Sequence, residues 1–169
     1  MNIEIARRVV VFILLLWLDF QPVWAGSAGT YVNLGRTRYL MQNYADAVLQ
    51  FEKAAETDPE YPDIFGLLGA AQFQAGQLDA AIHSFKMQIA RTPDVATNHL
   101  NLGLAYMKKR QYVEAISAFQ KAAELDPDEI RAFRNLGNVF AAQGKPQLAE
   151  EAWKKAVALG PTWQDLYNL

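Results

Sequence analysis

Few side chains in this sequence are placed to do catalytic or metal chemistry. The two histidines, His83 and His99, lack neighbours at the spacing that a metal site needs. The serines that follow residue 25, Ser27, Ser84 and Ser117, show neither nucleophile-elbow nor triad spacing. The chain has no cysteine, which excludes disulfides and thiolate ligands. We therefore expect no enzyme activity, no cofactor and no bound metal.

The balance of charged residues argues against a general nucleic-acid binder. Eighteen acidic and 16 basic residues give a formal net charge of −2 in 169 residues. A protein that binds nucleic acid in general needs a basic surface, so we expect no nucleic-acid partner. The acidic cluster Asp126, Asp128 and Glu129 flanks a proline, where negative charge suits the start of a helix.

The glycines belong to a repeat and do not form a phosphate-binding loop. The tripeptide NLG occurs at 33–35, 101–103 and 135–137, and LLG occurs at 67–69. The chain therefore divides without gaps into four blocks of 34, at 28–61, 62–95, 96–129 and 130–163. All four blocks have Leu at position 7, Gly at 8, Ala at 20, Phe or Trp at 24 and Pro at 32. A fixed period of this length indicates stacked supersecondary units.

Each block predicts two helices, A and B. In the third block, apolar residues at positions 4, 7, 8 and 11 share one helix face, and those at 20, 21, 24, 27 and 28 share another. Polar turns such as 74–77 separate the halves, and the proline at position 32 ends each block. Glycine inside a helix costs about 1 kcal/mol relative to alanine. We expect it to let helix A approach helix B at the alanine of position 20, while the ring at position 24 faces the next repeat.

The order aromatic-x-x-Leu-Gly, Ala-x-x-x-aromatic and Pro resembles the tetratricopeptide repeat. The aromatic residue is Tyr31, Phe65 and Phe133 in three blocks, and His99 replaces it in the third. Other departures are Arg38 and Gln72 at position 11 and Gln88 at position 27. The resemblance implies an all-α, right-handed superhelical solenoid of antiparallel helix pairs. It would contain eight helices and a short C-terminal helix.

The resemblance also implies a peptide-binding groove lined by the A helices, at positions 2, 5, 6, 9, 12 and 13. The groove residues expected on this basis are Val32, Asn33, Arg36, Tyr39, Leu67, Phe73, Leu100, Asn101, Leu104, Met107, Lys108, Arg131, Arg134, Asn135 and Asn138. They combine an apolar floor with four cations opposed by Asp63, a net charge of +3 (four minus one). The matching partner is a peptide or protein that is apolar and carries acidic groups or a free carboxylate. The alternative is that the asparagines are repeat consensus and the cations are solvated surface.

Residues 1–25 have the character of a secretory signal peptide. Arg7 and Arg8 precede the apolar run Val9 to Leu18, and Val23 and Ala25 fit a cleavage site before Gly26. The alternative is a retained membrane anchor, but ten apolar residues span only about 15 Å as a helix, against roughly 30 Å of hydrocarbon. We therefore expect an exported protein, periplasmic or secreted, with no membrane span after cleavage.

The domain organisation expected is a signal peptide at 1–25, a repeat domain at 26–163 and a capping segment at 164–169. The C-terminal segment carries Trp163, Leu166, Tyr167 and Leu169 and either covers the last helix or serves self-association. The function expected is a non-catalytic interaction module or adaptor, with envelope assembly or secretion as its setting by family analogy. The alternative is a structural scaffold that assembles into a homo-oligomer through its ends.

Overall fold

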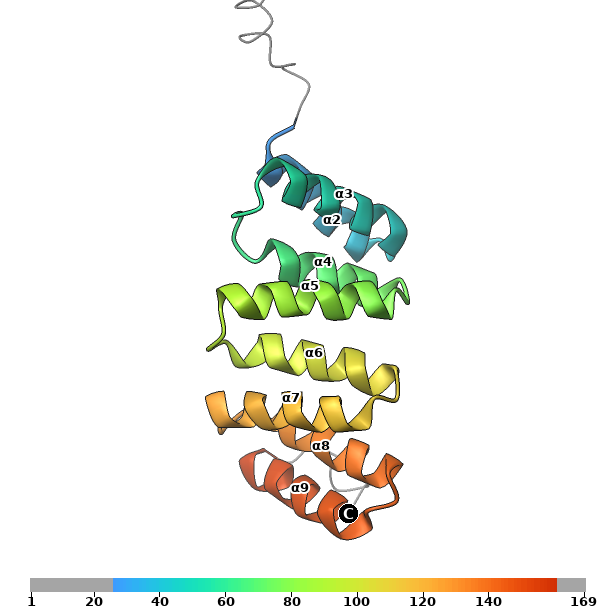
Figure 1. Cartoon of the computed structure of the whole chain (residues 1–169), viewed down its shortest axis with the longest axis vertical. Helices are drawn as coiled ribbons and strands as arrows, with labels where there is room; N and C mark the ends of the chain where they lie inside the picture. The colour runs from blue at the N-terminus through green and yellow to red at the C-terminus, as the bar shows by residue number, and fades with distance from the viewer. Residues whose placement is uncertain (1–25, 161–169) are drawn as a thin grey trace, which may run out of the picture.

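The computed structural model describes residues 26–160, which form eight α-helices and no strand (Figure 1). The helices are α2 (Ala28–Leu40), α3 (Tyr44–Thr57), α4 (Ile64–Gln74), α5 (Leu78–Arg91), α6 (Ala96–Lys108), α7 (Tyr112–Leu125), α8 (Ile130–Ala142) and α9 (Pro146–Leu159). Each block of 34 contributes one A helix and one B helix, so the all-α solenoid is confirmed. The expected signal peptide and C-terminal cap lie outside the described residues.

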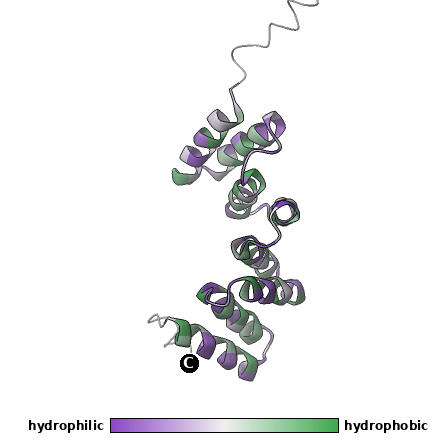
Figure 2. Cartoon of the chain, turned by 90° about the vertical axis from the view of Figure 1, so that its left-hand side faces the viewer, coloured by the Kyte–Doolittle hydropathy of each residue, from purple (hydrophilic) through white to green (hydrophobic). Residues whose placement is uncertain are grey.

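The helix pairs stack along one axis, and their apolar faces form three adjoining buried clusters. In the turned view of Figure 2, hydrophobic and hydrophilic residues both occur on every helix, as expected for amphipathic helices that bury one side. Each helix packs mainly against the helices before and after it in sequence. A repeat that cannot bury its own apolar face alone is thus covered by its neighbours.

A left-handed residue follows every A helix, two positions after its last residue, at position 15 of the block. The φ angles are 59° at Gln42, 79° at Gly76, 60° at Arg110 and 70° at Gly144. In each repeat the next amide donates to the carbonyl of position 11 at 2.9 Å, as Gln111 does to Tyr106. This hydrogen bond across five residues is the Schellman arrangement, which satisfies carbonyls left free at a helix end. One turn geometry therefore joins A to B in all four repeats.

The repeat glycines accommodate aromatic rings, which corrects the expected packing. A Cβ atom placed on Gly103 would lie 2.5 Å from the ring of Phe119, and one on Gly35 would lie 2.6 Å from the ring of Phe51. The same pairing joins Gly69 to Phe85 and Gly137 to Trp153. The glycine therefore faces the ring at position 24 of its own repeat and not the alanine at position 20. The same ring also packs toward the next repeat, as expected, since Phe119 shares a buried cluster with Leu136.

The second repeat replaces two apolar contacts with buried hydrogen bonds. Ser84 donates to the side-chain oxygen of Gln72 at 2.7 Å, and both residues are buried. The side-chain oxygen of Gln88 accepts from the Gly66 amide at 3.3 Å, and its amino group donates to Thr92 at 3.2 Å. The polar departures from the repeat pattern are thus paired with each other or with backbone, as buried polar groups generally are.

The two ends of the stack differ. The position 7 leucines of later repeats, Leu68, Leu102 and Leu136, are buried beneath the preceding repeat, whereas Leu34 of the first repeat is 38% exposed. At the other end, Glu150 occupies position 21, where the earlier repeats have Val48, Ile82 and Ile116. The described N-terminal edge therefore exposes an apolar residue at position 7, whereas α9 has a charged residue at position 21.

Candidate peptide-binding groove

The A helices α2 and α4 enclose an apolar pocket of about 330 Å³. It is lined by Arg36, Tyr39, Leu40, Phe51, Leu67 and Ala70. Three of these, Arg36, Tyr39 and Leu67, belong to the groove residues expected from the sequence, and Leu40 and Ala70 occupy groove positions of the same repeats. The two helices lie less closely together than the later pairs α4 with α6 and α6 with α8, which leaves room for the pocket.

A small residue at position 9 of the second repeat keeps this part of the groove open. Position 5 is Gly66 and position 9 is Ala70, where the next repeat has Leu100 and Leu104. The side chain of Asp63 folds over Gly66, so that a Cβ atom placed on Gly66 would clash with the Asp63 carboxylate oxygen. Asp63 precedes α4 in the left-handed conformation, with φ at 59°. Helix α4 starts at position 3 of its block, two positions later than α6 starts in the third block.

Cations border the groove at the same level as the pocket. The ammonium group of Lys108 lies 4.5 Å from the ring centre of Phe73 and donates to the Phe73 carbonyl at 3.4 Å. Arg36 forms no ion pair with any residue that the structure describes. Partial burial raises the pKa of Asp63, and the positive charge of Arg36 opposes that rise. Arg36 is thus only partly neutralised by the aspartate.

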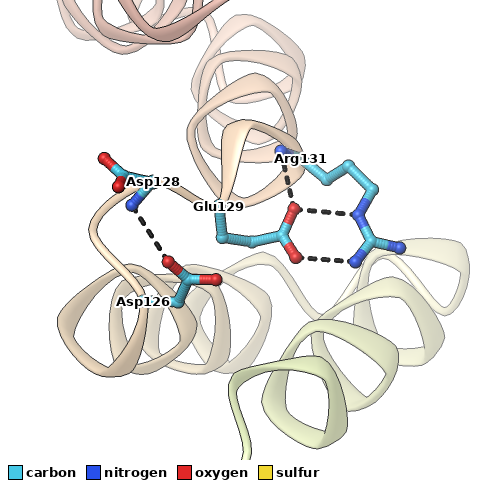
Figure 3. Close-up of polar contacts among 4 residues, drawn as sticks. All are labelled: Asp126, Asp128, Glu129 and Arg131. Atoms are coloured by element: carbon cyan, nitrogen blue, oxygen red, sulfur yellow. Dashed lines mark hydrogen bonds and ion pairs between the residues drawn. The ribbon is translucent and has the colours of Figure 1, made fainter.

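Arg131 is paired, which reduces the positive charge expected in the groove. Its guanidinium donates two hydrogen bonds to Glu129, from Nε at 2.8 Å and from Nη2 at 2.6 Å (Figure 3). Glu129 also accepts from the Arg131 backbone amide at the start of α8. The hydrogen bonds and charge of Arg131 lower the pKa of Glu129. With Glu129 included, the groove charge is +2 (four cations minus two anions).

Two of the expected groove residues are in the core. Val32 and Leu100, both at position 5, are 0% and 1% exposed. Position 5 faces between the helices in these repeats, so neither side chain lines the surface. Arg134 occupies the same position in the fourth repeat and is half-buried.

The remaining expected residues have at least part of their surface open. Lys108, Arg131 and Asn33 are exposed, and the others are half-buried: Tyr39, Leu67, Phe73, Asn101, Leu104, Met107, Asn135 and Asn138. Asn138 accepts a hydrogen bond from Trp153 at 3.2 Å, so it also contributes to packing within its repeat.

A second hollow lies between the B helices α7 and α9, and sequence reasoning missed it. Its volume is about 530 Å³, and its lining residues are Gln120, Ala123, Glu124, Phe133, Leu136, Phe140, Leu148, Glu151, Ala152 and Lys155. The available signal was the apolar series at positions 4, 7 and 11 of the fourth block together with exposed Leu148. The acidic groups Glu124 and Glu151 distinguish it from the apolar pocket of the first two repeats.

No group of three or more potential ligands is placed to hold a metal ion within residues 26–160. His99 instead points one ring nitrogen at the Pro93 carbonyl, 2.8 Å away. Over the same stretch no helix is long and apolar enough to cross a membrane.

Comparison with family models shows which protein family is related to this chain. Two tetratricopeptide repeat models match it, one over residues 39–102 and the other over 94–161. The chain belongs to the tetratricopeptide repeat family. Proteins with this tetratricopeptide fold typically serve as non-catalytic protein-interaction modules. A search among curated proteins gives no match.

Solved tetratricopeptide repeat structures resemble the whole stack. MamA from Desulfovibrio magneticus RS-1 is 27% identical, with a TM-score of 0.75 over 79% of this chain and 75% of that one. YrrB, described as having an unusual peptide-binding site, is 25% identical, with a TM-score of 0.75 over 83% and 73%. A thermophilic tetratricopeptide repeat protein from Thermus thermophilus is 25% identical, with a TM-score of 0.70 over 85% and 79%.

Proposed function

We propose that this protein is an exported adaptor that binds an apolar, acidic peptide segment along the face of its A helices. The observation that carries the proposal is the open apolar pocket between α2 and α4, bordered by Arg36 and followed along the groove by Lys108. Apolar floors with a few cations suit peptides that combine apolar and acidic side chains. The similarity to YrrB, whose description names a peptide-binding site, supports the same class of ligand.

The proposed setting is envelope assembly or secretion. It rests on the signal-like composition of residues 1–25, where two arginines precede a short apolar run and small residues follow. Mass measurement of the protein recovered from the culture or periplasm tests export. A mature chain that begins at Gly26 supports the proposal, and an intact N-terminus in the cytoplasm contradicts it.

Selection from a random peptide library tests the binding function. Peptides enriched on the purified protein are expected to shift the amide resonances of groove residues such as Asn101 and Leu104. Lys108→Glu should weaken their binding at least tenfold, because it places a negative charge opposite an acidic ligand. Lys53→Glu, a reversal on the exposed surface of α3, should change binding less than twofold. If no peptide is enriched, or if the shifts occur around Leu148, the proposed function is wrong.

The second candidate function is a scaffold that self-associates through its first repeat. Leu34 is 38% exposed, although the equivalent leucines of the other repeats are buried by a preceding repeat. Light scattering over a concentration series distinguishes the two candidates. A mass that rises with concentration and returns to that of a monomer in Leu34→Glu favours the scaffold.

A further inference from the structure

We propose that the pocket between α2 and α4 is the anchor site of the groove, taking one large apolar side chain of a peptide whose acidic residue lies about three positions away and reaches Lys108. This inference rests on the proposed peptide-binding function and specifies its ligand.

The size and lining of the pocket select the anchor. Its volume of about 330 Å³ is lined by aromatic and aliphatic groups, with Arg36 as the charged lining residue. Burying a large aliphatic or aromatic side chain is the main source of affinity at such a site. A leucine, phenylalanine or tryptophan side chain therefore suits the pocket, and a charged side chain would lose its hydration there.

The pocket forms at the second repeat because this repeat has a small residue where the next repeat has a large one. Ala70 occupies position 9, and the next repeat has Leu104 at that position. Position 5, which is the buried Leu100 in the third repeat, is Gly66. Over Gly66 lies the carboxylate of Asp63, which occupies the volume that a position 5 side chain would take. The open space at Ala70 is thus a property of this repeat and not of the repeat pattern.

The spacing to the acidic residue follows from helix geometry. Lys108 is at position 13 of α6, level with the pocket residues at positions 9, 12 and 13 of α2, whereas Arg131 and Arg134 are at positions 2 and 5. Neighbouring helices lie about 8–10 Å apart. The ammonium group of Lys108 rests on Phe73 of α4 and so lies between α4 and α6, about one such step, or about 9 Å, from the middle of the α2–α4 pair. An extended peptide advances about 3.3 Å per residue, so about three residues cover that distance.

The charge along this path fits an acidic residue. Lys108 forms no ion pair with the described part of the chain, and its ammonium group rests against Phe73. The two anions of the groove are Asp63, close to Arg36, and Glu129, which pairs with Arg131. Each is thus offset by a nearby cation, which leaves the Lys108 charge to meet the ligand.

The test is peptide selection on three versions of the protein. A random library is selected on the parent, on Ala70→Leu and on Ala90→Leu, a matched change at an exposed site of α5. Leucine suits position 9 of an A helix, since Leu104 occupies it, so circular dichroism and melting temperature should be unchanged. Peptides from the parent should share an apolar residue and an acidic one two to four positions away. Ala70→Leu should weaken these peptides at least tenfold and Ala90→Leu less than twofold.

A charge change at Lys108 tests the second half of the ligand. Selection on Lys108→Glu should keep the apolar anchor and replace the acidic residue with a basic one at the same spacing. Peptides that bind the groove of the parent but are unaffected by Ala70→Leu, or that show no acidic residue at this spacing, overturn the anchor site and leave the proposed function standing. Absence of any enriched peptide overturns both.

Discussion

At the scale of single residues, the contact between a glycine and a ring determines how each helix pair closes. Gly103→Ala places a methyl group 2.5 Å from the ring of Phe119, which is fully buried in the core. Overpacking of this kind costs about 1–3 kcal/mol, more than the gain of about 1 kcal/mol in helix propensity. We expect a net loss of stability in urea unfolding.

The control for this prediction is another helical glycine. A methyl group on Gly29 in α2 would have its nearest neighbours at 3.8 Å, an ordinary contact distance. Gly29→Ala should therefore leave stability unchanged or raise it slightly. Combining Gly103→Ala with Phe119→Leu should cost less than the sum of the two single changes, because the smaller side chain makes room for the methyl group. Simple additivity would show that the two residues do not share this contact.

The sequence predicted the positions of the helices better than the contacts between their side chains. The repeat of glycine, alanine and aromatic residues is enough to predict eight helices, because one helix face recurs every 34 residues. It does not reveal that the glycine meets the ring of its own repeat, or that Val32 and Leu100 turn inward, since both depend on how far each helix is rotated. The pairing of Glu129 with Arg131 was missed for the same kind of reason, because neighbouring side chains can bend in several directions.

At the scale of the elements, the ends of the helices carry testable differences between repeats. Arg110 and Gln42 adopt the left-handed conformation that Gly76 and Gly144 adopt in the equivalent turns. In this conformation, a residue with a side chain is strained by about 1 kcal/mol or more. Glycine avoids that strain, but part of its advantage is lost because glycine has more conformational freedom in the unfolded chain. Arg110→Gly should therefore raise the free energy of unfolding by about 0.5 kcal/mol.

The reverse substitution provides the check on this turn. Gly144→Ala should lower stability by about 1 kcal/mol, although a methyl group there would meet no atom within 4 Å. The loss would then come from backbone conformation alone. Equal stability of Gly144→Ala and the parent would show that the turn relaxes, and Arg110→Gly should then gain nothing.

The start of α8 makes stability depend on pH. The pKa of Glu129 lies below its ordinary value of 4.5 in the folded protein, because Arg131 and its backbone amide donate hydrogen bonds to the carboxylate. A lowered pKa means that the stabilisation is present above the unfolded pKa and is lost as pH falls through the folded one. Glu129→Gln should cost up to about 1 kcal/mol at pH 7, since Arg131 is exposed to solvent.

The comparison of parent and Glu129→Gln isolates this pair. Their difference in free energy of unfolding should shrink as pH falls below about 4.5 and vanish once Glu129 is protonated, because the neutral acid then resembles the amide. The raised pKa of Asp63 acts equally in both proteins and cancels in the difference. A difference that stays constant from pH 7 to pH 3 would contradict the assigned ion pair.

At the scale of the whole molecule, the unequal ends limit how copies of the stack can associate. The B helix of each repeat covers the leucine at position 7 of the next repeat. No helix among residues 26–160 covers Leu34 in this way. A head-to-tail contact would place Leu34 against α9, where Glu150 is exposed and pairs with Lys154 at 2.5 Å. Burying that ion pair against an apolar edge would cost desolvation without a matching gain.

Association through two N-terminal edges avoids this cost. Each copy would present Leu34 to the other, and a two-fold contact closes after one partner has bound. We therefore expect light scattering to give a mass no larger than a dimer at any concentration, with Leu34→Glu monomeric throughout. Glu150→Leu removes the charge at the far end and should allow larger assemblies by making head-to-tail contact favourable. Growth beyond a dimer in the parent protein would show that the polar edge of α9 does not block stacking.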